Sequence, residues 1–76
     1  MSGSSTDRLV HDANQIARYF ASYPRDEALA GVVDHIKKFW ERRMRAQIIL
    51  HVAHGGAGLD ELALAAVKQL PPVAGA

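Results

Sequence analysis

The stretch "HIKKFWERRMR", residues 35–45, decides the fold, because two apolar helical stripes change direction within it. One stripe is centred on Ile36 and the next on Ile48. At about 100° per residue, these stripes would be offset by roughly 110° on one straight helix, which would then need two different partners. A break near Trp40–Arg42 lets both stripes face a single core. The offset therefore favours two helices here, although the stretch contains no helix-breaking residue.

The same stretch holds five basic residues within nine positions, and three roles are open for them. On a helix, Asp34 lies four residues before Lys38. Glu41 lies four residues before Arg45, and both pairs have the favourable acid-first orientation. Such pairing is typical of a solvated charged face, while Arg, Trp and Met together are typical of a protein interface. A nucleic-acid face, the third alternative, is typically built from several unpaired cations with no acids among them.

Signals elsewhere divide the chain into further helices. Thr6 is placed to cap a first helix, and Pro24 suits the first turn of a second one. Gly55–Gly56 mark a helix end, and Asp60 can cap a final helix. No stretch shows the period-two alternation of strands. The sequence predicts an all-α fold, a small domain of three to four helices at about 7–22, 25–40, 42–54 and 60–70, with flexible termini at residues 2–5 and 73–76.

Length and composition indicate a small folded protein. The 76 residues form a single helical domain with an ordered core at about 7–70, and 49% of them are hydrophobic, which argues against disorder. The absence of cysteine excludes disulfides and thiolate metal sites and fits a reducing compartment. A net charge of +1 gives no global attraction for nucleic acid or anionic lipid. No apolar run approaches the roughly 20 residues of a membrane span, and no signal peptide pattern opens the chain. We therefore expect a cytoplasmic protein that binds neither nucleic acid nor membrane.

The sequence offers no catalytic, cofactor-binding or metal-binding constellation. His51 and His54 lie one turn apart, but no Cys, Asp or Glu is near them, so they are more simply the polar end of a helix. The segment "HGGAG", residues 54–58, lacks the Lys-Ser/Thr of a P-loop and does not follow a strand. There is no Gly-x-Ser-x-Gly motif and no paired carboxylate in an apolar setting. We expect a chain that is not an enzyme by itself and binds no cofactor or metal.

Asn14 and Gln15 lie on a helix edge made otherwise of small residues. Asparagine lowers helix propensity, and a buried amide needs hydrogen-bond partners. Asn14 is therefore either an ordinary boundary amide or a residue that bonds a closely approaching backbone. That backbone would belong to another helix or to another subunit.

Four segments, in their order and spacing, resemble the delta subunit of the cytoplasmic, NAD-dependent, molybdenum-containing formate dehydrogenases. They are "ANQIARYF", "DEALAGVVDHIKKFW", "RMRAQIILH" and "GGAGLDELALAAV", and the resemblance extends from about Leu9 to Val67. The family commonly reads Phe-Trp-Asp-Pro-Arg-Met-Arg where residues 39–45 of this chain read Phe-Trp-Glu-Arg-Arg-Met-Arg. Asp-Pro would supply a helix cap and a first-turn proline. In this chain the break must rest on other residues.

The resemblance implies a non-catalytic accessory subunit of a large soluble complex that oxidises formate to CO2 and reduces NAD. In that family the alpha subunit carries the molybdenum bis-guanine-dinucleotide cofactor and iron–sulfur clusters. The beta subunit carries FMN and the NAD site, and the gamma subunit carries a further cluster. The delta subunit has no known redox centre and is linked to assembly or stability of the active complex. The lack of cysteine agrees with this, because iron–sulfur clusters are ordinarily held by cysteine.

We predict that the chain docks on the catalytic alpha subunit through the aromatic–arginine–methionine cluster, with the Asn-Gln pair as a second contact. The predicted interface residues are Asn14, Gln15, Phe39, Trp40, Arg43, Met44 and Arg45. The alternative is a self-associating helical adaptor or a regulator unrelated to formate oxidation.

Overall fold

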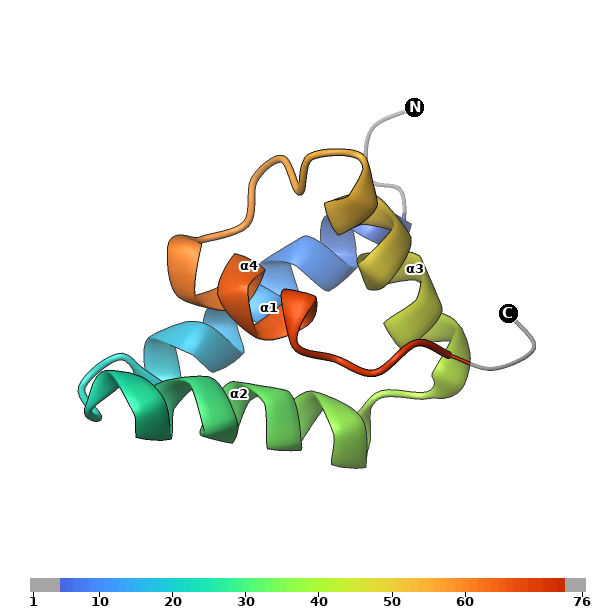
Figure 1. Ribbon diagram of the computed structural model, residues 1–76. Coiled ribbons are helices and arrows are strands. Elements are labelled where there is room, and N and C mark those ends of the chain that lie inside the picture. Colours follow the sequence, from blue (N-terminus) through green and yellow to red (C-terminus); the bar gives the residue numbers. More distant parts are fainter. Residues whose placement is uncertain (1–4, 74–76) are drawn as a thin grey trace.

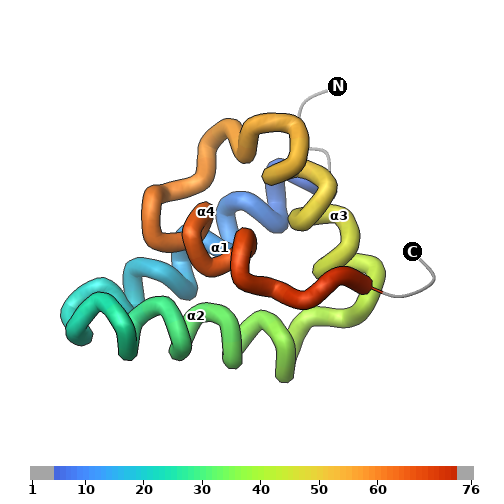
Figure 2. The backbone as a smooth tube through the Cα atoms, in the orientation of Figure 1, coloured from blue at the N-terminus to red at the C-terminus, as the bar shows by residue number. Residues whose placement is uncertain are grey.

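The computed structural model describes residues 5–73, which form four helices and, within that range, no strand (Figure 1). The helices are α1 (Ser5–Phe20), α2 (Arg25–Phe39), α3 (Arg42–Ala53) and α4 (Glu61–Lys68). The short α4 contacts each of the other three, and in the view of Figure 2 it lies above α2 and in front of α1. The predicted all-α class and the division of residues 25–54 into two helices are confirmed.

The beginning of α1 differs from the predicted one. Because α1 starts at Ser5, Thr6 lies inside the helix, and its predicted role as a cap is wrong. The hydroxyl oxygens of Ser5 and Thr6 instead accept hydrogen bonds from Gln47 Nε2 of α3, at 2.9 and 2.7 Å. These bonds hold the first turn of α1 against α3. The remaining predicted flexible positions, 2–4 and 74–76, lie outside the described residues.

Both apolar stripes around residues 35–45 reach one core. The side chains of Val32, Ile36 and Ile48 are fully buried. Alanines of α1 and α4 let the backbones of these helices approach closely, as dense core packing requires. The buried cluster consists of Leu9, Ala13, Ala17, Val32, Ile36, Trp40, Ile48, Ala63, Ala66, Val67 and Leu70.

The break between α2 and α3 falls at Trp40–Glu41. Trp40 has an extended backbone (φ −93°, ψ 135°), and its side chain is only 7% exposed. Glu41 is also extended (φ −67°, ψ 159°) and makes no side-chain capping hydrogen bond. Arg45 Nη1 donates to the carbonyl oxygens of Trp40 at 2.9 Å and of Lys37 at 3.4 Å, groups that a helix end leaves without intrahelical partners. Burial of Trp40 and this arginine therefore stabilise the break in place of a local Asp-Pro signal.

One of the two predicted ion pairs on this stretch is present. Asp34 Oδ2 lies 3.1 Å from Lys38 Nζ, so that pair is confirmed. The predicted Glu41–Arg45 pair is wrong, because no ion pair joins these two residues in the described part of the chain. The Arg45 guanidinium turns back to the carbonyl groups at the end of α2 instead.

Replacing Arg45 by methionine is expected to lower the free energy of unfolding by about 1–2 kcal/mol, because a charged donor is removed from the last carbonyls of α2. Methionine retains much of the apolar stem, so the loss reports mainly on the hydrogen bonds. Equilibrium denaturation measures the difference. The matched control is Arg42→Met, at an exposed position. Equal stability of the two variants would contradict the capping role of Arg45.

Glycines shape the connection that follows α3. Gly55 N–H donates to the Val52 carbonyl oxygen and Gly56 N–H to that of His51, both at 2.9 Å, the pattern of a Schellman helix end. Gly55 (φ 114°) and Gly56 (φ 66°) adopt positive φ values, which other residues adopt only with strain. A Cβ at Gly56 would lie 2.6 Å from Leu64 Cδ1, so α4 packs directly on this turn. The predicted glycine helix end is confirmed.

The first turn of α4 is tethered to two other helices. Asp60 occupies the N-cap position but makes no side-chain capping bond, so the predicted cap is wrong in this respect. Its Oδ2 instead lies 3.5 Å from Arg18 Nε of α1. Glu61 accepts two hydrogen bonds of 2.6 Å each from the Arg25 guanidinium at the start of α2. These bonds lower the pKa of the exposed Glu61 carboxyl and raise the pKa of Arg25.

Candidate docking surfaces

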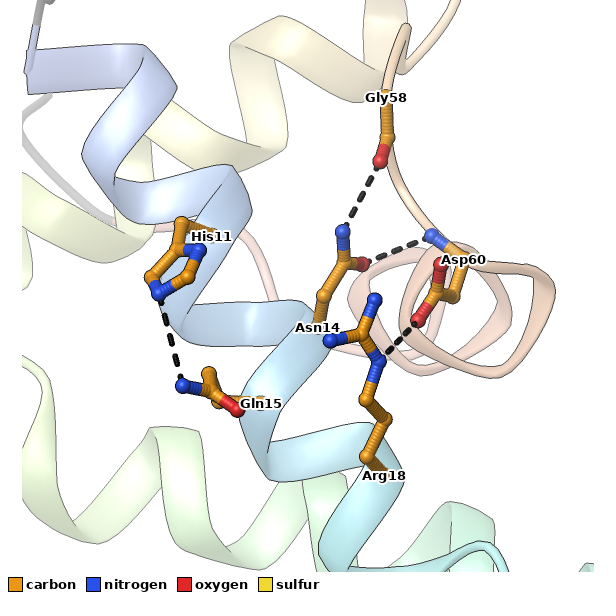
Figure 3. Close-up of polar contacts among 6 residues, drawn as sticks. All are labelled: His11, Asn14, Gln15, Arg18, Gly58 and Asp60. Carbon is orange, nitrogen blue, oxygen red and sulfur yellow. Dashed lines mark hydrogen bonds and ion pairs between the residues drawn. The ribbon is translucent and has the colours of Figure 1, made fainter.

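Asn14 fastens α1 to the connection between α3 and α4 (Figure 3). Its Nδ2 donates to the Gly58 carbonyl oxygen at 2.9 Å, and its Oδ1 accepts from the Asp60 backbone N–H at 2.8 Å. Asn14 therefore does bond a closely approaching backbone, as one of the two predicted alternatives requires, and that backbone belongs to the same chain. Both polar atoms of the side chain act in holding the fold together.

Gln15 points to a different side of α1, where its Nε2 lies 3.5 Å from His11 Nε2 (Figure 3). Together with Tyr19 of α1 and His35 of α2, Gln15 lines a shallow hollow of about 400 Å³. The ring of His35 lies 4.7 Å, centroid to centroid, from the ring of Phe39. Tyr19 and Phe39 are 71% and 69% exposed. We call Gln15, Tyr19, His35 and Phe39 the aromatic face.

The predicted aromatic–arginine–methionine cluster is divided among different surroundings. Phe39 belongs to the aromatic face, whereas Trp40 is buried in the core. Met44 is half-buried and packs against the core, and Arg45 holds the last carbonyls of α2. Arg43 is exposed on α3. Binding of a partner by the seven predicted interface residues stays a prediction, and only Gln15, Phe39 and Arg43 among them are exposed.

A second hollow, of about 580 Å³, lies between α3 and the segment after α4. Its lining is mostly apolar, and Leu50, 59% exposed, stands between Ala46 and Ala53 on the outer side of α3. Across the hollow lie Pro72 and Val73. We call this the α3 groove; its residues used below are Arg43, Ala46, Leu50, Ala53, Pro72 and Val73.

The two neighbouring histidines at the end of α3 bond backbone carbonyls. His51 Nε2 lies 2.8 Å from the Ala57 oxygen, and His54 Nδ1 lies 3.0 Å from the Leu50 oxygen. No group of three or more His, Cys, Asp or Glu that could hold a metal ion occurs between residues 5 and 73. Within the same range, none of the helices combines the length and the hydrophobicity needed to cross a membrane.

One known protein family is similar to most of this chain. The family described as the NADH-dependent formate dehydrogenase delta subunit, FdsD, matches residues 8–67. The chain belongs to this family. The resemblance inferred from the sequence segments is thereby confirmed. No curated protein and no solved structure matches the chain.

The FdsD match bears on the two surfaces differently. It covers the whole aromatic face and all seven predicted interface residues, whereas Pro72 and Val73 of the α3 groove lie beyond it. Membership in a delta-subunit family implies association with other formate dehydrogenase subunits. A member of the FdsD family therefore needs exposed docking surface, and both surfaces can serve.

Sequence reasoning did not assign Tyr19, His35 or Leu50 to a docking surface. The first two had a detectable signal, because each lies four residues from a predicted interface residue and so on the same side of its helix. Tyr19 follows Gln15, and His35 precedes Phe39. Leu50 had no such signal, since an apolar residue inside a helix is expected in the core until its neighbours in space are known.

Proposed function

We propose that this chain is a non-catalytic accessory subunit that supports assembly or stability of a cytoplasmic formate dehydrogenase complex, which oxidises formate to CO2 and reduces NAD. The family match supports its place in such a complex. The absence of cysteine supports a role without a redox centre, because iron–sulfur clusters ordinarily need cysteine ligands. The molybdenum cofactor, the iron–sulfur clusters, FMN and the NAD site would then belong to other subunits.

The aromatic face is the observation that carries the proposed docking on the catalytic alpha subunit. Tyr19 and Phe39 expose large rings on two neighbouring helices, and Gln15 and His35 place polar groups between them. Clustered aromatic surface next to polar groups is typical of protein interfaces, whereas isolated apolar residues on a surface are common and need no explanation. The burial of Trp40 moves the proposed contact from the Trp–Arg pair to this face.

The test is recovery of the alpha subunit with a tagged copy of this chain, co-expressed with the formate dehydrogenase subunits. The double variant Tyr19→Ala/Phe39→Ala is expected to reduce recovery about tenfold or more, because exposed aromatic anchors often dominate binding energy. Tyr23→Ala is the matched control, since it removes an exposed aromatic ring that does not belong to the aromatic face.

Two results would contradict the proposal at different levels. If the Tyr19/Phe39 variant recovers as much alpha subunit as the control does, the docking face is wrong. If the wild-type chain recovers no formate dehydrogenase subunit, and its loss leaves formate-dependent NADH production intact, the proposed function is wrong. A helical adaptor or regulator unrelated to formate oxidation would then be the better reading.

A further inference from the structure

The α3 groove combines an apolar floor with Arg43, which forms no ion pair within residues 5–73. Leu50 is its exposed centre, and the small side chains of Ala46 and Ala53 leave space on either side of it along α3. Pro72 and Val73 form the opposite wall, because the segment after α4 runs toward the beginning of α3 (Figure 1). The groove is thus an open, apolar trough alongside a helix.

The charged side chains among residues 5–73 that line the groove and the hollow beside it are all basic. Arg43 lines it, and Arg42 precedes Arg43 at the start of α3, a helix that contains no acidic residue. On the other side of Pro72 and Val73, a smaller hollow is lined by Lys37 and Arg45. Among residues 5–73, no carboxylate lines either hollow. The whole chain carries a net charge of only +1, so this concentration of cations is a local feature.

The fold does not account for Arg42 and Arg43. Arg18, Arg25 and Lys38 each lie within 4 Å of a carboxylate oxygen of the same chain, whereas no ion pair to Arg42 or Arg43 forms within residues 5–73. The first turn of a helix favours acidic rather than basic side chains, so two arginines there slightly destabilise α3. A carboxylate supplied from outside the chain would pair with them.

The walls of the groove also favour one shape of ligand. An extended peptide binds mainly through backbone hydrogen bonds to a free sheet edge. Here the backbone of α3 is engaged in its own helix, and Pro71 and Pro72 have no N–H to donate. Binding must then come from side chains, which is how an amphipathic helix packs its apolar face into a groove.

We propose that the α3 groove binds an amphipathic helix of another formate dehydrogenase subunit, with apolar residues one turn apart facing Leu50 and with Asp or Glu side chains facing Arg42 and Arg43. This inference rests on the proposed function and adds a second contact, separate from the aromatic face. Small residues at 46 and 53 let the partner helix approach α3 closely, and the arginines fix its direction along the groove.

Photo-cross-linking in the assembled complex tests the occupant directly. A photoreactive phenylalanine analogue is placed at position 50 of the tagged full chain and, as the matched control, at the exposed Ala30 on α2. Mass spectrometry of the adduct from position 50 is expected to identify a helical peptide of another subunit with carboxylates beside its apolar residues. Position 30 is expected to give at least tenfold less of that adduct. A covalent dimer of this chain, a peptide without acidic residues, or no adduct from position 50 would each overturn the proposal.

Charge variants provide an independent measure. Arg42→Glu/Arg43→Glu is expected to reduce the position-50 adduct about tenfold, while Arg42→Lys/Arg43→Lys retains most of it at low salt. Equal amounts of the adduct from both double variants would contradict the proposed pairing of acidic partner residues with Arg42 and Arg43. Recovery of the alpha subunit by the tagged chain distinguishes a failure of the groove proposal from a failure of the proposed function. Normal recovery without the adduct contradicts the groove alone, and no recovery contradicts the proposed function as well.

Discussion

Replacing Trp40 by alanine is expected to destabilise the domain by about 3–5 kcal/mol, because a buried indole leaves a large cavity where α2 meets α3. Trp40 is 7% exposed and belongs to the same buried cluster as Ile36 and Ile48. Native proteins have a free energy of unfolding of about 5–15 kcal/mol, so this loss would remove a large part of the stability. Thermal and denaturant unfolding, followed by circular dichroism, measure the change.

The adjacent Phe39 provides the matched control for this experiment. Its ring is 69% exposed and contacts His35 on the surface, so Phe39→Ala is expected to change the free energy of unfolding by no more than about 0.5 kcal/mol. We therefore expect the Trp40 substitution to affect mainly stability and the Phe39 substitution to affect mainly binding. A stable Trp40→Ala chain that fails to bind the alpha subunit would contradict the core assignment.

Replacing Asn14 by leucine is expected to lower the free energy of unfolding by about 2–3 kcal/mol, because the Asp60 N–H and the Gly58 carbonyl lose their partner together. Asp60 N–H is the more costly loss, since that bond is partly buried. Asn14→Asp retains the acceptor for this N–H and loses the donor to Gly58, so its stability is expected to lie between those of wild type and Asn14→Leu.

Hydrogen exchange locates the effect of the Asn14 variants. The Asp60 amide is expected to exchange faster in Asn14→Leu than in the wild-type chain under identical conditions, because its side-chain acceptor is missing. The control is Gln15→Leu at the neighbouring exposed position, whose side chain makes no bond to the α3–α4 connection. Unchanged protection of Asp60 in Asn14→Leu would show that the two hydrogen bonds do not hold α1 to this connection.

The break between α2 and α3 was predictable from the direction of the apolar stripes, since Ile36 and Ile48 can share one core only if the chain turns between them. The means of the break was not predictable. Arg45 caps α2 from five residues beyond Trp40, and a local reading of charge spacing pairs it with Glu41 instead. The predicted side-chain caps at Thr6 and Asp60 failed for the same reason, because contacts with distant residues override local capping preferences, although Asp60 does occupy the N-cap position of α4.

The candidate site was predictable only in part. Sequence spacing identified Gln15 and Phe39, and the structure places them on one face formed by α1 and α2. It could not distinguish Phe39 from Trp40, because adjacent residues of the same type differ in exposure only once the end of the helix is fixed. The α3 groove was beyond sequence reasoning altogether, since Pro72 and Val73 meet Leu50 through the path of the chain after α4.

The break at Trp40–Glu41 depends on tertiary contacts, and this bears on whether two copies of the chain can exchange helices. No proline fixes the hinge, and Glu41, Arg42 and Arg43 are all good helix formers. If Trp40 leaves the core, nothing local prevents α2 and α3 from joining into one continuous helix. Such a helix would separate the two halves of the domain, and two copies of the chain could then exchange halves. This exchange is domain swapping, to which variants of hinge residues are prone. The buried indole, together with Arg45 at the end of α2, therefore favours separate α2 and α3 helices packed within one chain over a continuous helix.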